Sequence, residues 1–256
     1  MSRKSLIKMD RVSKRFDNGF LALSEMSLTL EVGEFVSFLG PSGCGKSTAL
    51  KIIAGLLPQT SGTVEIAPSA AISEHDLGFV FQEPTLMPWA NVFDNVFLPL
   101  RLAGLPRKKA SERVMHILSE VGLSAFTKAF PRELSGGMKM RVSIARALVT
   151  QPRVLLMDEP FAALDEITRS KLNNDVLRVC NEHKLTVIFV THSVFEAVFL
   201  SNRVFIMASR PGRLVNQLAI DATWPRTEDW KTSKYFAMEA RRVSEALKGT
   251  IDDSDL

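Results

Sequence analysis

The segment from Gly40 to Thr48 constrains the fold more than any other part of this sequence. It reads Gly-Pro-Ser-Gly-Cys-Gly-Lys-Ser-Thr and follows a mostly apolar run, residues 34–39, of strand length. A helical pattern over residues 46–57 follows it. Glycines let the backbone turn tightly so that successive N–H groups point inward, and a helix N-terminus adds partial positive charge. A strand, a glycine-rich loop and a helix in this order predict a phosphate-binding loop, the P-loop.

The side chains of this loop fit a nucleoside triphosphate. We expect Lys46 to neutralise the outer phosphates and the Ser47 hydroxyl to ligate Mg²⁺. The alternative is a purely structural role, as an ordinary glycine-rich turn between a strand and a helix. Cys44 is expected to act through its backbone and not through redox chemistry. The candidate nucleotide contacts in this loop are Gly40, Pro41, Ser42, Gly43, Cys44, Gly45, Lys46, Ser47 and Thr48.

A P-loop alone leaves kinases, GTPases, helicases and transport ATPases open. The Asn-Lys-x-Asp pattern that reads guanine is absent from the sequence, which argues against a GTPase. The net charge is only +4 and no basic run reaches five residues, so nucleic acid is not an expected partner. Two cysteines are too few for a disulfide framework. The charged N-terminus is no signal peptide, and no apolar run approaches the roughly 20 residues of a membrane span. We therefore expect a soluble chain in a reducing compartment.

The order of strand-like and helical runs predicts an α/β fold with a mostly parallel sheet. Residues 78–81, 154–157 and 186–190 have strand character, and they are separated by helical patterns. We predict a nucleotide-binding core formed by residues 1–84 and 151–220, and an inserted helical subdomain over residues 85–150. A C-terminal extension, 221–256, is expected to hold one helix at about 228–247.

Two further segments bear on the chemistry. Ser135, in Leu134-Ser-Gly-Gly-Met138, is placed as a helix N-cap and predicts a second anion-binding terminus, although such a segment alone is usually only a cap. Residues 154–157 form an apolar strand that delivers Asp158 at its end, where a Mg²⁺ site beside a P-loop needs a carboxylate. Glu159 follows it and could polarise the attacking water. The alternative for the two acids is a simple turn.

With these segments the chain resembles the ATP-binding subunits of ABC transporters. Leu134-Ser-Gly-Gly matches the family signature, with Met138 where Gln is more common. The remaining matches are Gln82 for the Q-loop, Asp165 for the D-loop, His192 for the switch histidine and Phe16 for the adenine-stacking aromatic, a position that is usually Tyr. Taken singly, Phe16 could be a core aromatic and His192 a structural histidine.

The resemblance implies a P-loop NTPase core with an inserted helical subdomain, and ATP hydrolysis coupled to transmembrane transport. It implies Ser47, Gln82 and Asp158 around Mg²⁺, Glu159 as general base and His192 as sensor of the γ-phosphate. It also implies a head-to-tail homodimer in which each active site borrows Ser135 and Gly137 from the opposite subunit. The nucleotide contacts implied outside the P-loop are Phe16, Ser135, Gly136, Gly137 and Asp165.

A finer resemblance is to importers of the nitrate, sulfonate and taurine type. It rests on Met87-Pro-Trp89, Phe161-Ala-Ala-Leu-Asp165 and Arg210-Pro-Gly-Arg213, together with the signature. It implies a transmembrane permease, a separate solute-binding protein, and a location in the cytoplasm on the inner face of the membrane. We expect Leu86, Met87 and Trp89 to line an exposed groove beside Gln82 for a permease helix, while most neighbouring apolar residues form core.

Three rival functions remain at this point. An ABC ATPase acting on DNA or the ribosome would need long coiled coils or a second cassette, which the sequence lacks. A small-molecule kinase would leave the signature and His192 unexplained. A regulatory nucleotide binder without activity would not need the Asp158-Glu159 pair.

Overall fold

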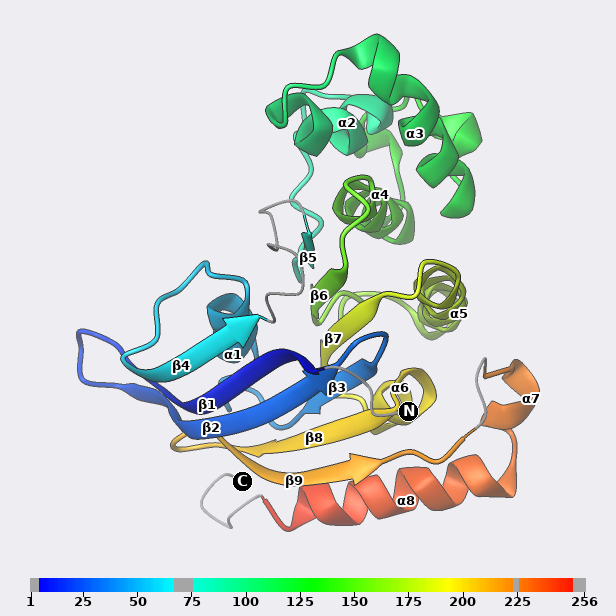
Figure 1. The fold of residues 1–256 in the computed structure, drawn as a ribbon. Helices are drawn as coiled ribbons and strands as arrows, with labels where there is room; N and C mark the ends of the chain where they lie inside the picture. The colour runs from blue at the N-terminus through cyan, green and yellow to red at the C-terminus, as the bar shows by residue number, and fades with distance from the viewer. Residues whose placement is uncertain (1–4, 67–75, 223–225, 251–256) are drawn as a thin grey trace. The chain divides into compact units, whose positions relative to one another are not determined.

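The computed structural model describes residues 5–66, 76–222 and 226–250. It forms two compact units, of which the first combines residues 1–72 with 185–256 and the second is residues 73–184 (Figure 1). These units are defined by compactness. The predicted functional division into core, helical insert and extension remains a prediction.

The first unit contains an antiparallel sheet of three strands. Strand β1 (Ser5–Arg15) lies between β2 (Leu21–Glu31) and β4 (Ser61–Ile66) and pairs antiparallel with both. Buried and exposed residues alternate over much of β2, so one face of this sheet is apolar.

The same unit contains strands in the order β7, β3, β8, β9. Strand β3 (Phe35–Leu39) pairs in parallel with β7 (Thr186–Thr191) and with β8 (Arg203–Ala208), and β9 (Arg213–Ala219) is antiparallel to β8. Every residue of β3 and β7 is buried, as expected for parallel strands covered on both faces. The P-loop therefore leaves the sheet from an interior strand.

Helices of the first unit differ from the sequence predictions at two places. Helix α1 (Lys46–Ile53) is shorter than predicted because Gly55, with φ 70°, takes the left-handed conformation that ends helices. The single helix predicted at 228–247 is wrong. It is divided into α7 (Glu228–Lys231) and α8 (Lys234–Lys248), because Ser233 accepts a hydrogen bond from Phe236 N at 3.1 Å and starts a new helix. The remaining helix of this unit is α6 (Val194–Leu200).

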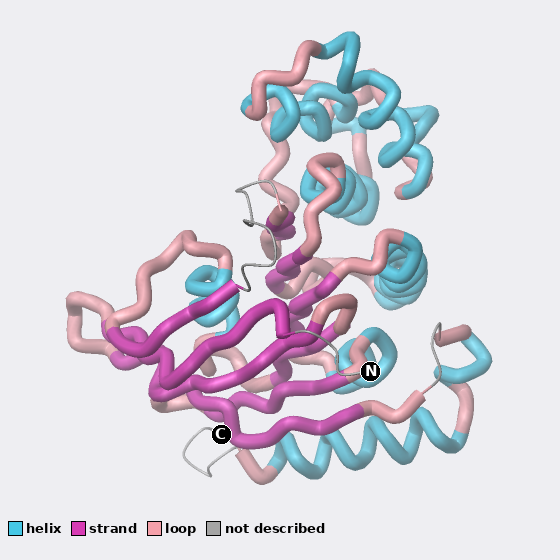
Figure 2. Tube along the Cα trace, in the orientation of Figure 1, coloured by secondary structure: helices cyan, strands magenta, loops and turns pink. Residues whose placement is uncertain are grey.

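The second unit is mainly helical, as the cyan segments of Figure 2 show. Its strands β5 (Leu77–Val80) and β6 (Val154–Asp158) pair in parallel. Its helices are α2 (Val92–Leu102), α3 (Arg107–Glu120), α4 (Gly136–Leu148) and α5 (Glu166–Glu182), with 3₁₀ turns at Ser124–Phe126 and Pro131–Glu133. The predicted helix start at Asn91 is confirmed, since its side chain accepts from Asp94 N at 2.8 Å.

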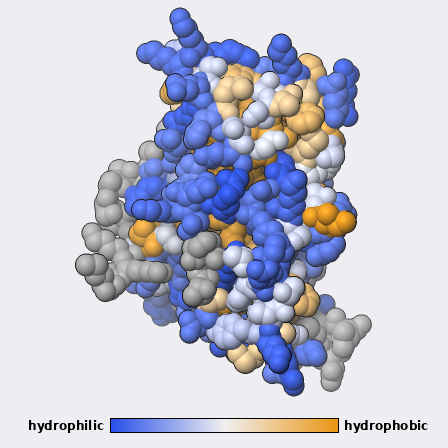
Figure 3. All heavy atoms as spheres, turned by 90° about the vertical axis from the view of Figure 1, so that its right-hand side faces the viewer, coloured by the Kyte–Doolittle hydropathy of each residue, from blue (hydrophilic) through white to orange (hydrophobic). Residues whose placement is uncertain are grey.

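The helical core of the second unit follows the predicted apolar pattern. Along α4 and its flanks, Leu134, Val142, Ala145 and Val149 are buried and Met138 is half-buried. In Figure 3 hydrophobic side chains gather in the upper part of the view, among hydrophilic ones. Over the described ranges, no helix is both long enough and apolar enough to cross a membrane.

Candidate active site

The P-loop begins where the buried strand β3 ends and closes at the first turn of α1. Gly43 and Gly45 have φ angles of 77° and 90°, in the left-handed region that glycine enters without steric cost. Gly45 is the N-cap of α1, and no side chain caps that helix start. The N-terminus of α1 thus lies at the loop, where the sequence analysis places a predicted phosphate site.

Lys46 lies inside the loop that precedes it. Its side chain is only 4% exposed, and its Nζ donates hydrogen bonds to Gly40 O at 2.7 Å and Pro41 O at 2.9 Å. The ammonium group is thus fixed beside the N-terminus of α1, where the helix dipole is also positive. A phosphate bound here would contact both the Lys46 ammonium group and the N-terminus of α1.

Close backbone packing fixes the shape of the loop. A Cβ on Gly45 would come within 2.8 Å of Ala22 O, and one on Gly40 within 2.6 Å of Met207 O. Gly212 packs against the same region, because its Cβ would lie 2.5 Å from Ala22 O and closer still to Cys44 O. No pattern in the sequence predicted a role for Gly212. The sequence feature that could have indicated this contact is the glycine within the Arg210-Pro-Gly-Arg213 segment.

Two further site residues belong to the first unit. Phe16 follows β1 in a turn closed by the bonds Phe16 N to Phe20 O and Gly19 N to Phe16 O, both 2.9 Å. Its ring is 38% exposed, so Phe16 is not a core aromatic. Its ring centroid lies 5.4 Å from the Lys14 ammonium. His192 is exposed and directly follows β7.

The chain around His192 is held by short-range hydrogen bonds. Thr191 Oγ1 donates to Glu196 Oε2 at 2.5 Å and accepts from Ser193 N at 3.0 Å. The Ser193 hydroxyl caps α6 by accepting from Glu196 N at 3.3 Å. His192 therefore sits between a buried strand end and a capped helix start, which limits how its backbone can move.

The second unit holds the acidic pair. Asp158 is the last residue of the fully buried β6 and is only 7% exposed. Glu159 is half-buried and has φ 44°, a left-handed conformation that costs a non-glycine residue on the order of 1–3 kcal/mol. Buried Pro160 and Phe161 follow it. Such a costly conformation persists only where the surrounding structure holds it, so the backbone at Glu159 is fixed.

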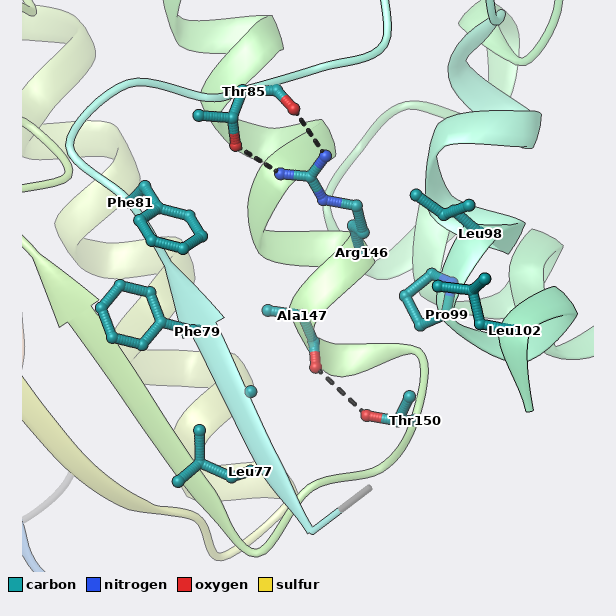
Figure 4. A pocket seen from close by; sticks show the side chains of 11 residues that line it. Leu77, Phe79, Phe81, Thr85, Leu98, Pro99, Leu102, Arg146, Ala147 and Thr150 are labelled. Carbon is teal, nitrogen blue, oxygen red and sulfur yellow. Dashed lines mark hydrogen bonds between the residues drawn. The ribbon is translucent and has the colours of Figure 1, made fainter. Parts of the chain in front are cut away.

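Gln82 is exposed in the loop after β5, and Arg146 of α4 contacts that loop at Thr85 (Figure 4). Arg146 donates to Pro84 O and Thr85 O, both at 2.8 Å, and to Thr85 Oγ1 at 3.0 Å. Burial lowers the pKa of Arg146. The sequence gave no signal for this contact, since the partners are about sixty residues apart.

A cavity of about 530 Å³ lies beside this contact in the second unit. Figure 4 shows its lining, which comes from β5, the loop after it, α2 and α4. Apolar side chains such as Phe79, Phe81 and Leu98 form much of the wall, and Arg146 and Thr85 form a polar part of it.

The signature segment and the D-loop segment lie side by side in the second unit. Ser135 is the N-cap of α4, as predicted, and its hydroxyl accepts from Met138 N at 3.3 Å. Asp165 caps α5 by accepting from Thr168 N at 2.9 Å. The backbone and side-chain hydrogen bonds from Thr168 lower the pKa of Asp165. A Cβ on Gly137 would lie 2.6 Å from Thr168 Cγ2, so the two helix starts are in close contact.

The predicted site residues thus fall into two sets. The first unit carries Phe16, the P-loop from Gly40 to Thr48, and His192. The second carries Gln82, the 135–137 segment, Asp158, Glu159 and Asp165. Local hydrogen bonds place Lys46 in the first unit, and Ser135 and Asp165 in the second.

Several apolar residues after Gln82 are core residues, as predicted, while the groove of Leu86, Met87 and Trp89 stays a prediction. Val92, Phe93, Val96 and Phe97 are buried, Leu86 and Met87 are half-buried, and Trp89 is 77% exposed. Asn95, which is fully buried on α2, accepts from Met87 N at 2.8 Å and donates to Ala90 O at 2.9 Å. This asparagine fixes the segment and was missed by sequence reasoning. The cavity in Figure 4 is lined by other residues than Leu86, Met87 and Trp89.

Comparison with known proteins agrees with these features. The family described as ABC transporter matches residues 23–162. The taurine import ATP-binding protein TauB of Rhizobium johnstonii is 43% identical over 257 residues, covering 96% of this chain and 98% of the relative. The aliphatic sulfonates import ATP-binding protein SsuB 2 of Pseudomonas syringae pv. tomato is 44% identical over 218 residues, covering 84% and 88%.

Solved structures are similar as well. A dimeric ATP-binding cassette in a post-hydrolysis state with bound ADP and Pi has a TM-score of 0.75 and 32% identity, covering 85% of this chain and 100% of its own. The cbiO1 protein of Clostridium perfringens, part of an ABC transporter complex, has a TM-score of 0.77 and 25% identity, covering 95% and 99%.

The P-loop, the signature helix and the match across most of the chain define a class: the chain belongs to the ABC transporter family, as an ATP-binding subunit. It binds and hydrolyses ATP to energise an ABC transporter, as the sequence predicted. The small-molecule kinase and the inactive regulatory binder are therefore set aside.

Proposed function

We propose that this ATPase energises the import of a small solute of the nitrate, sulfonate and taurine class. The observation that supports this most is the identity of 43–45% to ATP-binding proteins named for taurine and aliphatic sulfonate import. The solute itself would be chosen by the permease and the solute-binding protein. The ATPase chain would supply the energy and the timing of the transport cycle.

ATP would bind with its phosphates on the P-loop. The N–H groups of the loop and of α1 would cradle the phosphate oxygens, while Lys46 would leave the carbonyls of Gly40 and Pro41 to contact the outer phosphates. Phe16, whose ring is 38% exposed, would stack on adenine.

The residues present fit Mg²⁺. Ser47, Gln82 and Asp158 offer a hydroxyl, an amide oxygen and a carboxylate, and Mg²⁺ prefers oxygen ligands. Bound together with ATP, the ion would neutralise charge on the phosphate oxygens. Asp158 suits this role because the buried strand β6 fixes its backbone.

Hydrolysis would depend on Glu159 and His192. The Glu159 carboxylate would orient the attacking water and accept its proton, and its backbone is held in a left-handed conformation directly after β6. His192 would donate a hydrogen bond to the γ-phosphate and so report whether that group is present. These groups act by position and charge, and no covalent intermediate with the protein is needed.

Each nucleotide would be shared between two copies of the chain in a head-to-tail homodimer. Ser135 and Gly137 at the start of α4, with Asp165 beside them, would face the nucleotide on the opposite copy. The N-terminus of α4 suits phosphate for the same reason as the P-loop. Hydrolysis would then release the dimer and reset the transporter.

The permease would dock on the second unit near the loop that follows Gln82. The exposed Trp89 and the half-buried Leu86 and Met87 offer apolar surface there. This docking would hold the chain in the cytoplasm, against the inner face of the membrane. Trp89→Asp should abolish co-purification with the permease while basal ATPase activity stays within about threefold. Full permease binding by this variant would place the docking site elsewhere.

Transport by the complete system tests the proposed solute class. Vesicles holding the permease and this ATPase, supplied with the solute-binding protein, should take up taurine, an alkanesulfonate or nitrate only when ATP is enclosed on the ATPase side. ATP turnover by the complex should rise with the same solute. If none of the three solutes is taken up or raises turnover, the solute class is wrong even though the chain remains an ATPase.

A further inference from the structure

The C-terminal residues 226–248 pack on the helix that starts just after His192. Helix α6 begins at Val194, two residues beyond His192, and it contacts α8. Figure 1 shows α6, α7 and α8, all within the first unit. The family match at residues 23–162 includes none of these three helices.

Arg226 caps the far end of α6. Its Nη1 donates to Val198 O at 2.5 Å and to Phe199 O at 2.8 Å, and its Nη2 donates to Ser201 O at 2.6 Å. The last carbonyls of a helix have no partner within the helix, and a cation there also interacts favourably with the helix dipole. One guanidinium therefore satisfies three carbonyls at or next to the C-terminus of a seven-residue helix.

Arg226 is an interior group and not a surface charge. It is 5% exposed, and burial lowers its pKa to about 10. The nearby Glu239 carboxylate, itself 4% exposed on α8, works in the opposite direction and favours the charged form. At neutral pH the guanidinium stays charged, so its three hydrogen bonds are charge-assisted.

Aromatic side chains continue this contact from α6 to α7 and α8. The Arg226 guanidinium lies 4.8 Å from the Trp230 ring centroid, and Trp230 meets Phe236 edge-on at 4.9 Å. Phe236 in turn stacks on Phe195 of α6 at 6.0 Å. Phe195 is three residues from His192. The stacked pair of Phe195 and Phe236 therefore contacts the start of α6, while Arg226 contacts its end.

The C-terminal end of α6 is also joined to the sheet. Ser201 Oγ and Ser37 Oγ of β3 are joined by a buried 2.5 Å hydrogen bond, and Asn202 Oδ1 accepts from Phe35 N at 2.9 Å. These bonds do not involve Arg226. Removal of Arg226 would leave β3, and with it the P-loop, attached to the end of α6.

We propose that Arg226, with Trp230 and Phe236, forms a C-terminal clamp that positions His192 by holding α6 at both ends. The clamp sets the rate of ATP hydrolysis and leaves ATP binding unaffected. This inference rests on the proposed role of His192 as γ-phosphate sensor. Arg226 is a positioning residue that acts through α6, since the contacts described above are with α6, α7 and α8.

The first test compares Arg226→Gln with Arg241→Gln in the full chain. Arg241 lies on α8 with its side chain exposed and paired with Glu245, so the control makes the same substitution outside the clamp. For Arg226→Gln we expect kcat per ATP-binding site to fall about tenfold while the Kd for ATP stays within about twofold. Arg226→Lys keeps the charge and some of the hydrogen bonds, so its kcat should lie between those of Arg226→Gln and Arg241→Gln.

Amide hydrogen exchange separates positioning from general loss of stability. Arg226→Gln should lose protection in the segment 191–200 and keep it in β3, because the clamp holds α6 and not the P-loop strand. A purely structural role would lower the melting temperature and the fraction of folded chain, with kcat per ATP-binding site unchanged. That result would overturn the inference.

Phe195→Ala provides a second variant in case Arg226→Gln does not fold. Phe195 is 65% exposed, so its loss should not disturb the core, yet it removes the stacking on Phe236. Its kcat should also fall, by about threefold or more, with ATP affinity retained. His192→Ala is measured alongside. If His192→Ala keeps the parental kcat, the proposed sensor role fails; if only His192→Ala loses turnover, the sensor role stands and the clamp is wrong.

Discussion

Arg146 of α4 donates two hydrogen bonds to Thr85, one to its carbonyl oxygen at 2.8 Å and one to its hydroxyl at 3.0 Å. Thr85 is three residues beyond Gln82 and has φ 45°. The helix that starts at the signature segment is therefore joined directly to the loop that carries Gln82. Movement of one would be transmitted to the other through a planar, bidentate group.

Arg146→Lys should weaken this link, because an ammonium group cannot serve two carbonyls and a hydroxyl with the fixed geometry of a guanidinium. We expect a loss of about 1–3 kcal/mol in stability and a severalfold lower stimulation of ATPase activity by the permease. The Kd for ATP should be unchanged. Arg101→Lys, on the exposed face of α2, is the control. Equal stimulation in both variants would show that the link is not used in coupling.

Lys46→Ala should weaken MgATP binding by about a hundredfold or more, because it removes the cation that serves the outer phosphates. Equilibrium titration with a fluorescent ATP analogue measures this. Lys51→Ala, an exposed position on the same helix, should bind as the parent does. Parental affinity in Lys46→Ala would refute the P-loop assignment.

Glu159→Gln should bind ATP normally and hydrolyse it more slowly by about two to four powers of ten, because an amide cannot accept the proton of water. The variant should accumulate as an ATP-bound dimer, visible by size-exclusion chromatography. Glu166→Gln, an exposed acid in the first turn of α5, provides the comparison. Turnover near the parental rate would remove Glu159 from the role of base.

Ser135→Arg should block hydrolysis while each chain still binds ATP, because the start of α4 is proposed to face the partner's nucleotide. Mixing it with Lys46→Ala gives a sharper test. In a mixed dimer one shared site carries both changes and the other carries neither, so about a quarter to a half of the parental activity should return, depending on mixing. No recovery, with mixed dimers shown to form, would contradict shared sites.

Gly212→Ala should impair ATP binding although Gly212 is far from the P-loop in sequence. Its new Cβ would overlap Cys44 O and Ala22 O, so the P-loop backbone would have to shift. We expect ATP affinity to fall by about tenfold with a modest loss of stability. Gly249→Ala, whose nearest atom would be 3.7 Å away, is the matched control. Identical affinities for the two variants would show that the loop tolerates the shift.

Local signals in the sequence determined much of this protein. The P-loop, the caps at Asn91 and Ser135, and the strand that ends at Asp158 were all predicted, because each depends on residues within a few positions of one another. The signature and its companion motifs identified the family for the same reason. The break between α7 and α8 was missed, although it too is local, because Ser233 lies within an otherwise continuous helical pattern.

Only the tertiary structure decided the contacts between distant segments. Three such contacts join residues that are 25 to 168 positions apart. They are the hydrogen bonds of Arg146 to Thr85, the packing of Gly212 on Cys44, and the cap that Arg226 forms on α6. The sequence does not indicate which distant carbonyl group an arginine or a glycine will contact. That partner is set by how helices and strands pack, because close packing and the pairing of buried polar groups are properties of the folded chain as a whole.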